Sequence, residues 1–224
     1  MYVFKNCISI FFATVLEVSK MIVRICTSHW CLAMSFIEFS QYFGQYSVCL
    51  VRHRGECVLC PVNAASLGDV SRYCHDFTDV DEVNSYLSLN VSSALCLTAG
   101  VLRMFPQRTG LTRVIVNVSS LSALQPFPSW VLYCSGKAAR DMMFRVLAEE
   151  EPDLRVLNYA PGPLDTDMQL QARSSSADDA LRNSFSIMHA QGQLLTCDQS
   201  INKLIKVLLE NKYPSGAHLD FYDL

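Results

Sequence analysis

A serine, a tyrosine and a lysine are the residues of this 224-residue chain whose types and spacing could carry out chemistry. Ser120 follows the apolar run 114–118, and Tyr133 and Lys137 lie four residues apart in the segment after it. Residues four apart share one face of a helix, so Tyr133 and Lys137 can both approach the group that Ser120 contacts. The spacing therefore predicts a site for proton transfer.

The three side chains have complementary chemistry. A free tyrosine has a pKa of about 10, too high for a base at neutral pH, and a nearby lysine cation lowers that pKa. We therefore expect Lys137 to lower the pKa of Tyr133. A serine hydroxyl both donates and accepts hydrogen bonds, so Ser120 can hold a carbonyl while Tyr133 protonates its oxygen. A hydride from another molecule would complete a carbonyl reduction.

Alternating strands and helices must position these residues. The apolar, β-branched runs 113–118 and 154–159 predict buried strands, 217–222 predicts a final edge strand, and 81–101 predicts a helix. Residues 170–192 have the composition of a mobile lid. Three predicted helices are each expected to begin at a polar N-cap: Asp79, Ser129 and Asp198. This order predicts an α/β fold, a doubly wound parallel sheet with helices on both faces.

The ordered pattern of Ser120, Tyr133-x-x-x-Lys137 and Pro161-Gly162 resembles the short-chain dehydrogenase/reductase family of nicotinamide-dependent oxidoreductases. Five further segments are similar to members of that family that reduce pterins: 63–70, 122–127, 136–141, 157–168 and 215–223. The resemblance covers about residues 62–224. It implies a Rossmann-like sheet, NADP(H) as cofactor, and a cytoplasmic enzyme that reduces pterin side-chain carbonyls toward tetrahydrobiopterin.

The resemblance also implies a role for each catalytic residue. Ser120 would hold the carbonyl and Tyr133 would donate the proton. Lys137 would lower the pKa of Tyr133 and bind the nicotinamide ribose. Asn90 would complete a proton relay, although an asparagine on an apolar helix face is also consistent with a core amide.

The remaining implied contacts belong to the substrate and the cofactor. The substrate would contact Ser120, Tyr133, Gly162 and Asp220, and Asp220 would anchor the pterin ring. The cofactor would contact Asn63, Tyr133, Lys137, Leu164, Asp165, Thr166, Asp167, Met168 and Gln169. The alternatives are a loop asparagine at position 63, an ordinary Pro-Gly turn at 162 and a surface aspartate at 220. Methionines at helical spacing, Met142 and Met143, suggest either core packing or a homodimer seam.

Residues 1–60 do not share the resemblance, which divides the chain into this unmatched segment and a catalytic body, 61–224. The family places a glycine-rich turn in its first βα unit to receive the cofactor pyrophosphate. Gly44 and Gly55 are isolated in this segment, and no glycine-rich turn occurs in it. We therefore expect the sheet to be incomplete at its N-terminal half.

Two further patterns in this segment have alternative interpretations. Lys5 with the apolar run 8–16 could begin a signal peptide, but no convincing cleavage site follows, and the run is too short to cross a bilayer. His53, Cys57 and Cys60 could form half of a zinc site. A second pair with matching spacing is absent from the sequence, so free cysteines are the favoured interpretation and no metal is expected.

Composition limits the remaining functions. Half of the residues are hydrophobic, which suits a sheet covered on both faces. The net charge of -3 shows no basic excess, so nucleic acid is not an expected partner, and neither is a membrane. Besides an NADPH-dependent pterin carbonyl reductase, two hypotheses stay open. One is a catalytically silent dimerisation partner or truncated isoform, and the other is a general carbonyl reductase.

Overall fold

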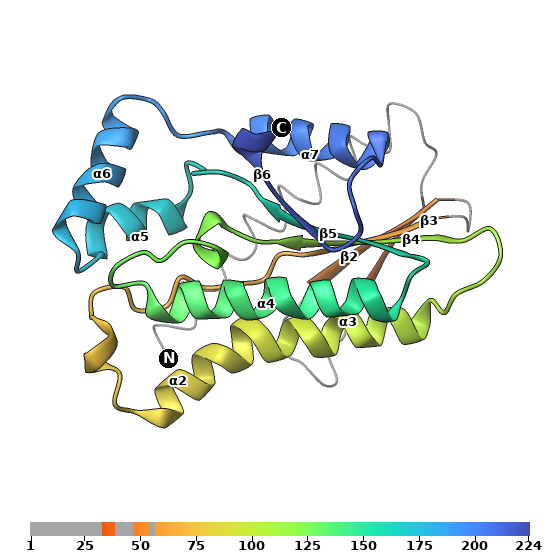
Figure 1. The fold of residues 1–224 in the computed structure, drawn as a ribbon, viewed down its shortest axis with the longest axis horizontal. Helices are drawn as coiled ribbons and strands as arrows, with labels where there is room; N and C mark the ends of the chain where they lie inside the picture. Colours follow the sequence, from red (N-terminus) through yellow and green to blue (C-terminus); the bar gives the residue numbers. More distant parts are fainter. Residues whose placement is uncertain (1–32, 39–46, 54–56) are drawn as a thin grey trace.

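A six-stranded sheet organises the computed structural model, which describes residues 33–38, 47–53 and 57–224 (Figure 1). Its order follows the chain: β1 (Ala33–Glu38), β2 (Ser47–His53), β3 (Cys57–Val62), β4 (Thr112–Val118), β5 (Leu154–Ala160) and β6 (Ala217–Asp220). Strands β3 to β6 are parallel, whereas β1 pairs with β2 and β2 with β3 in antiparallel register. The parallel sheet is confirmed, with four parallel strands in the described part.

Helices connect the parallel strands, as the sequence predicts. They are α2 (Val80–Leu87), η2 (Ser88–Ser92), α3 (Ser93–Met104), α4 (Val131–Glu150), α5 (Asp167–Ser175), α6 (Asp179–Ala190) and α7 (Cys197–Glu210). Three short 3-10 turns are η1 (Cys74–Asp76), η3 (Leu121–Ala123) and η4 (Phe221–Asp223). The crossovers β3–β4 and β4–β5 run through α2–α3 and α4, so each parallel neighbour is reached through a helix.

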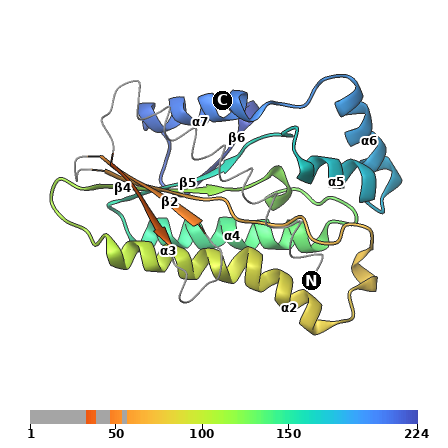
Figure 2. The same ribbon diagram turned by 180° about the vertical axis from the view of Figure 1, so that it is seen from behind.

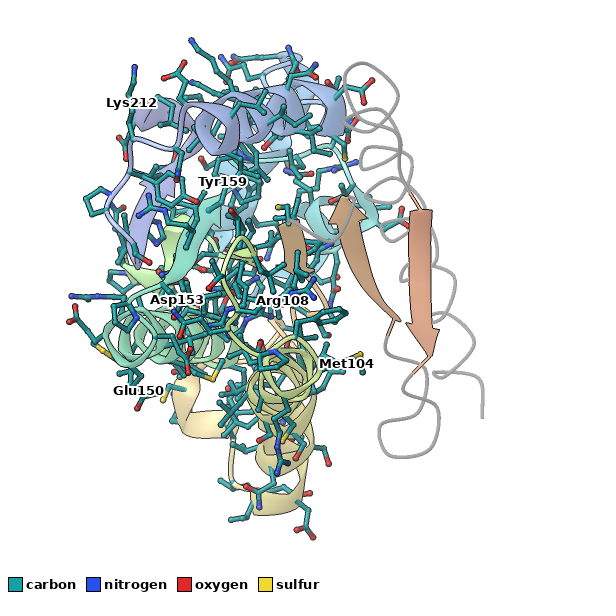
Figure 3. All side chains as sticks on the ribbon, turned by 90° about the vertical axis from the view of Figure 1, so that its right-hand side faces the viewer. Met104, Arg108, Glu150, Asp153, Tyr159 and Lys212 are labelled. Atoms are coloured by element: carbon teal, nitrogen blue, oxygen red, sulfur yellow. The ribbon has the colours of Figure 1, made fainter. Side chains whose placement is uncertain are left out.

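Helices cover both faces of the sheet. Ile115 on one face packs with Val101 of α3 and Phe144 of α4, whereas Val116 on the other face packs with Leu204 of α7. Successive strand residues point to opposite faces, so both must be apolar when both faces are covered. Figure 3, viewed end-on, shows α7 on one side of the sheet and α3 with α4 on the other. The doubly wound arrangement is therefore confirmed.

The helix formed by α2, η2 and α3 is continuous over Val80–Met104, and by length and composition it could cross a membrane. Ala94, Leu97 and Val101 are buried against the strands in the core, together with Phe144. Their burial explains the apolar composition, because a helix packed under a sheet needs one apolar face. It is a core helix of the domain.

The segment expected to be a lid folds as two helices, α5 and α6, which lie beyond the carboxyl ends of the parallel strands (Figures 1 and 2). They pack through Trp130, whose ring stacks on that of Phe185 with centroids 5.5 Å apart. The Trp130 indole Nε1 also donates to Ser176 Oγ at 2.9 Å. These contacts place a helical cover over the same edge of the sheet as Ser120.

One of the three predicted helix caps is correct and the other two are wrong. Asp79 caps α2 by accepting hydrogen bonds from the backbone N–H groups of residues 81 and 82. Ser129 does not cap α4, because it has a positive φ of 66° and α4 begins after Trp130, with the Ser129 hydroxyl buried and without a hydrogen-bond partner among the described residues. Thr196, rather than Asp198, caps α7 in a reciprocal capping box with Gln199.

Candidate active site

Three adjacent parallel strands end at the candidate site. In the sheet register Val118 of β4 lies beside Tyr159 of β5, and Ala160 of β5 lies beside Asp220 of β6. Ser120 and Gly162 follow the ends of β4 and β5, so both emerge at the same edge as Asp220. Ligands of open α/β sheets bind at this edge, outside the carboxyl ends of the strands. The topology therefore brings together the residues that the sequence placed there.

Tyr133 lies on the third residue of α4 and its side chain is buried. Burial raises the pKa of Tyr133 to about 12, while a hydrogen bond with Ser120 and the positive charge of Arg140 oppose that rise. The phenol is therefore protonated at neutral pH and in contact with Ser120. The predicted meeting of the serine and tyrosine hydroxyls is present, and the phenol is in the form that can donate a proton.

Lys137 lies one turn after Tyr133 and is also buried. Its Nζ donates to the backbone carbonyl of Val118 at 2.7 Å and lies 5.5 Å from the centroid of the Tyr133 ring. Burial and the charge of Arg140 lower the pKa of Lys137 well below its usual value, and Asp141 opposes them. Arg140 is one charge that lowers the pKa of Tyr133, and the effect of Lys137 on that pKa stays a prediction.

Gly162 turns the chain from β5 toward α5. Its φ is +76°, and a Cβ atom there would lie 2.7 Å from Leu195 Cδ1, so a side chain at this position would strain the loop. The loop is held by two backbone hydrogen bonds of 2.9 Å, from Asp165 N to Leu195 O and from Leu195 N to Pro163 O. Leu164 and Leu195 form an isolated parallel β-bridge in the same region. Backbone hydrogen bonds thus fix the conformation of this turn at the carboxyl edge of the sheet.

The next expected cofactor contacts open α5. Thr166 is the N-cap and accepts from the backbone N–H of Gln169, while Asp167 and Met168 form the first turn. Met168 packs in the cluster around Trp130 and Tyr133. The side chain of Gln169 is buried, and its Nε2 has no hydrogen-bond partner among the described residues. The amide oxygen accepts from Arg173. A buried amide nitrogen without a partner is costly, and a bound ligand that accepts a hydrogen bond would remove that cost.

The two predicted asparagines lie beside the loop that follows β3. Asn90, in the π-helical turn η2, accepts from Ser66 N at 2.7 Å and donates to Tyr86 O at 3.0 Å. Single π-helical turns inside helices often occur at functional sites. Asn63 is half-buried at the start of the same loop. Asn90 therefore positions the loop, and its role in a proton relay stays a prediction.

The family model described as short chain dehydrogenase matches residues 53–177 of this chain, which include Ser120, Tyr133 and Lys137. The chain belongs to the short-chain dehydrogenase family. The match starts before residue 61, and it covers the strands and helices from β3 to the end of α5.

Comparisons with individual members agree. The chain is 56% identical to sepiapterin reductase of Bos taurus over 161 residues, 72% of this chain and 60% of that protein. It is 58% identical to sepiapterin reductase of Xenopus tropicalis over 72% of this chain and 62% of that protein. The chain thus spans about three fifths of the length of these relatives. A solved short-chain dehydrogenase/reductase of Saccharomyces cerevisiae is 26% identical, with a TM-score of 0.66 over 75% of this chain and 67% of that one.

Asp220 lies at the same sheet edge as Ser120 and Gly162. Its side chain is 9% exposed, and its Oδ1 accepts from Tyr222 N at 2.9 Å. The alternative interpretation of position 220, a freely exposed surface aspartate, is therefore wrong. The carboxylate lies at the end of β6, the edge strand of the described sheet, and a carboxylate there can accept hydrogen bonds from a ligand.

Arg140 is a residue of the site that sequence reasoning missed. It follows Tyr133 by seven residues and Lys137 by three on α4, and it is 1% exposed. Its guanidinium donates to Val62 O at 2.6 Å, Ala64 O at 2.8 Å and Asn117 Oδ1 at 2.9 Å. Its position seven residues after Tyr133 could have predicted this, because residues seven apart share a helix face.

A second missed cluster surrounds Asp141, which is buried on α4. Its carboxylate accepts from Asn117 Nδ2 at 3.2 Å, from the Ser119 hydroxyl, and contacts Nδ1 of His218. Ser119 precedes Ser120, and His218 lies two residues before Asp220. The Asp141 cluster, defined as Asp141 with Asn117, Ser119 and His218, therefore ties the end of β4 to β6 through α4.

The two cysteines considered for a zinc site do not point toward a common metal position. Cys57 and Cys60 both lie in β3, where residues three apart point to opposite faces of the sheet. The side chain of His53 lies outside the described residues, as does the 5–16 segment considered for a signal peptide. Within residues 57–224, no group of three His, Cys, Asp or Glu side chains is placed to hold a metal ion.

Proposed function

We propose that this chain carries the site of an NADPH-dependent reductase that acts on the side-chain carbonyl of a pterin, a step toward tetrahydrobiopterin. The observation that carries the proposal is that a buried Tyr133 lies beside Ser120 at the carboxyl edge of a parallel sheet. The identity of 56% with a sepiapterin reductase supports the substrate class. A cytoplasmic location is part of the proposal, and cell fractionation tests it.

Each residue has a distinct task in this reaction. Ser120 donates a hydrogen bond to the carbonyl oxygen, which polarises the carbonyl and orients it toward Tyr133. A reduced nicotinamide, when bound, supplies the hydride that the carbonyl carbon takes. The O–H bond of Tyr133 breaks as the substrate oxygen gains the proton, and the electron pair stays on the phenolate. Lys137 and Asn90 are the residues proposed to return a proton to Tyr133.

The nicotinamide end of the cofactor fits the residues present. The unpartnered Nε2 of Gln169 can donate to a carbonyl or phosphate oxygen of the cofactor. Asn63, Lys137 and residues 164–169 are the proposed cofactor contacts. The sequence holds no glycine-rich turn for the pyrophosphate, so cofactor binding is the property to measure first.

The pterin ring is proposed to bind at Asp220. A pterin presents ring N–H and amino donors, which a carboxylate accepts through charge-assisted hydrogen bonds. The low exposure of Asp220 favours such bonds, because burial reduces competition with water. Gly162 would line the path between the ring site and Tyr133.

The first experiment is a fluorescence titration of the full chain with NADPH, with Tyr133→Phe as a control. We expect binding in the micromolar range for both proteins, since the tyrosine hydroxyl acts on the carbonyl rather than on the nucleotide. Absence of binding at millimolar NADPH would contradict the enzyme proposal and favour a catalytically silent partner. Equal turnover of a simple dicarbonyl and a pterin would instead favour a general carbonyl reductase.

A homodimer is proposed from the exposed apolar residues of two helices. Leu95 and Met104 on α3 are 53% and 44% exposed, and Met142 and Val146 on α4 are 54% and 46% exposed. Met143 packs on the core, so the methionines divide between the core and the surface. We expect the chain to sediment as a dimer and Met142→Glu to sediment as a monomer. A monomeric wild-type chain would contradict the proposal.

A further inference from the structure

A short 3-10 turn follows β6 and begins directly at Asp220. The turn η4 covers three residues, Phe221–Asp223, and Asp220 is its N-cap. Asp220 Oδ1 accepts from Tyr222 N at 2.9 Å, so the carboxylate proposed to hold the pterin also caps this turn. A single helical turn has little stability of its own. Contacts from other elements must therefore hold it in place.

Lys203 of α7 makes two such contacts with Phe221, the first residue of the turn. Its Nζ donates to the Phe221 carbonyl oxygen at 2.5 Å and lies 4.2 Å from the centroid of the Phe221 ring. An ammonium group over an aromatic face is attracted by the charge distribution of the ring. Lys203 is half-buried. The hydrogen bond and the cation–π contact together hold η4 against α7 (Figure 1).

Phe221 in turn packs on the glycine turn after β5. A Cβ atom at Gly162 would lie 3.4 Å from Phe221 Cβ and 3.7 Å from Phe221 Cγ. Helix α7 also holds this glycine turn, because Ser200 Oγ, three residues before Lys203, donates to Pro161 O at 2.8 Å. Residues three apart share a helix face. One face of α7 therefore holds both the glycine turn and η4.

Strand β6 is anchored on the opposite face of the sheet by His218. The His218 ring contacts Asp141 of α4, and α4 covers the face opposite to α7 (Figure 3). Asp220 thus lies between two anchors, two residues after His218 and one residue before Phe221. The anchor at His218 fixes the strand, whereas the anchor at Phe221 acts on the turn that Asp220 caps.

We propose that Lys203 is a positioning residue of the substrate site: by holding Phe221 it keeps η4 formed and so fixes the orientation of the Asp220 carboxylate. The inference rests on the proposed function, because that function assigns the pterin ring to Asp220. Since the cap uses Oδ1, Oδ2 is the oxygen that receives the ring N–H and amino donors. Without the turn, the carboxylate can rotate away from them. Lys203 acts through Phe221 and Asp220.

The test compares Lys203→Met with the parent, both as full chains. Methionine keeps most of the side-chain length and removes both the charge and the hydrogen-bond donor. We expect the KM for a pterin substrate to rise about tenfold, the usual effect of losing a hydrogen bond to a charged group, while kcat stays within about twofold of the parent. The kcat is kept because Ser120 and Tyr133 still act on the carbonyl. An unchanged KM overturns the proposal, and so does a loss of kcat with the parent KM.

Two matched variants accompany this measurement. Lys206→Met removes a charge from the same helix, where the Lys206 side chain is 76% exposed and pairs with Glu210. It is expected to keep the parent KM, and a rise equal to that of Lys203→Met overturns the proposal. Lys203→Arg keeps a cation and a donor, and we expect it to restore most of the lost affinity. A KM for Lys203→Arg as high as that of Lys203→Met also overturns the proposal.

Hydrogen exchange at the Tyr222 amide, followed by NMR, gives a readout that needs no turnover. This amide donates to Asp220 Oδ1, so we expect it to exchange about tenfold faster in Lys203→Met than in the parent. Equal exchange rates overturn the proposal. A parent chain that turns over no pterin loses the proposed function, and the exchange rate then decides by itself whether Lys203 holds the Asp220 cap.

Discussion

Tyr133→Phe is expected to lower the turnover of a pterin carbonyl by about 10²- to 10⁴-fold, the usual contribution of a general acid. Phenylalanine fills the same buried volume and removes only the hydroxyl that meets Ser120. The substrate oxygen then loses the group that is proposed to give it a proton, while the Ser120 hydroxyl still holds it. The measurement is the rate of NADPH oxidation with saturating cofactor and substrate.

Tyr73→Phe provides the matched control. Tyr73 is 40% exposed and stacks with His75, away from the helix that carries Tyr133. We expect this variant to turn over like the parent, because it loses a hydroxyl that does not meet the site. Turnover of Tyr133→Phe at the parent rate would show that another group supplies the proton.

Asp141→Ala is expected to lower the free energy of unfolding by about 3–5 kcal/mol, the effect of removing one member of a buried charged cluster. The substitution removes the partner of the Ser119 hydroxyl and of His218 Nδ1, and it removes one of the two acceptors of Asn117 Nδ2. It also removes the negative charge nearest to Lys137 and Arg140. Chemical denaturation, followed by circular dichroism, measures the change.

Two variants separate this effect from a general loss of a carboxylate. Glu149 is exposed on the same helix, and Glu149→Ala is expected to change stability by no more than about 0.5 kcal/mol. Asp141→Asn keeps two hydrogen-bonding atoms and is expected to fall between the parent and Asp141→Ala. Equal stability of Asp141→Ala and Glu149→Ala would show that the Asp141 cluster does not stabilise the fold.

The strands and the central motif were predictable because local sequence determines them. The predicted strands 113–118 and 154–159 differ from β4 and β5 by one residue at one end each. An apolar β-branched run buried on both faces has the same signature wherever it occurs. The cap at Ser129 was wrong because tertiary packing selected the first residue of α4. The cap at Asp198 was wrong because the local capping box of Thr196 with Gln199 begins α7 earlier. At the start of α4, packing of the neighbouring aromatic residues places Trp130 in the cluster with Phe185.

The amino-acid sequence by itself determined that Ser120, Tyr133 and Lys137 meet at the carboxyl edge of a parallel sheet, because their order and spacing follow strand and helix periodicity. Only the tertiary structure decided which buried polar groups surround these three residues. Arg140 donates to carbonyls 76 and 78 residues away, and Asp141 meets His218 across 77 residues. Burial and long-range contact set electrostatic strength, and neither is encoded in the local pattern.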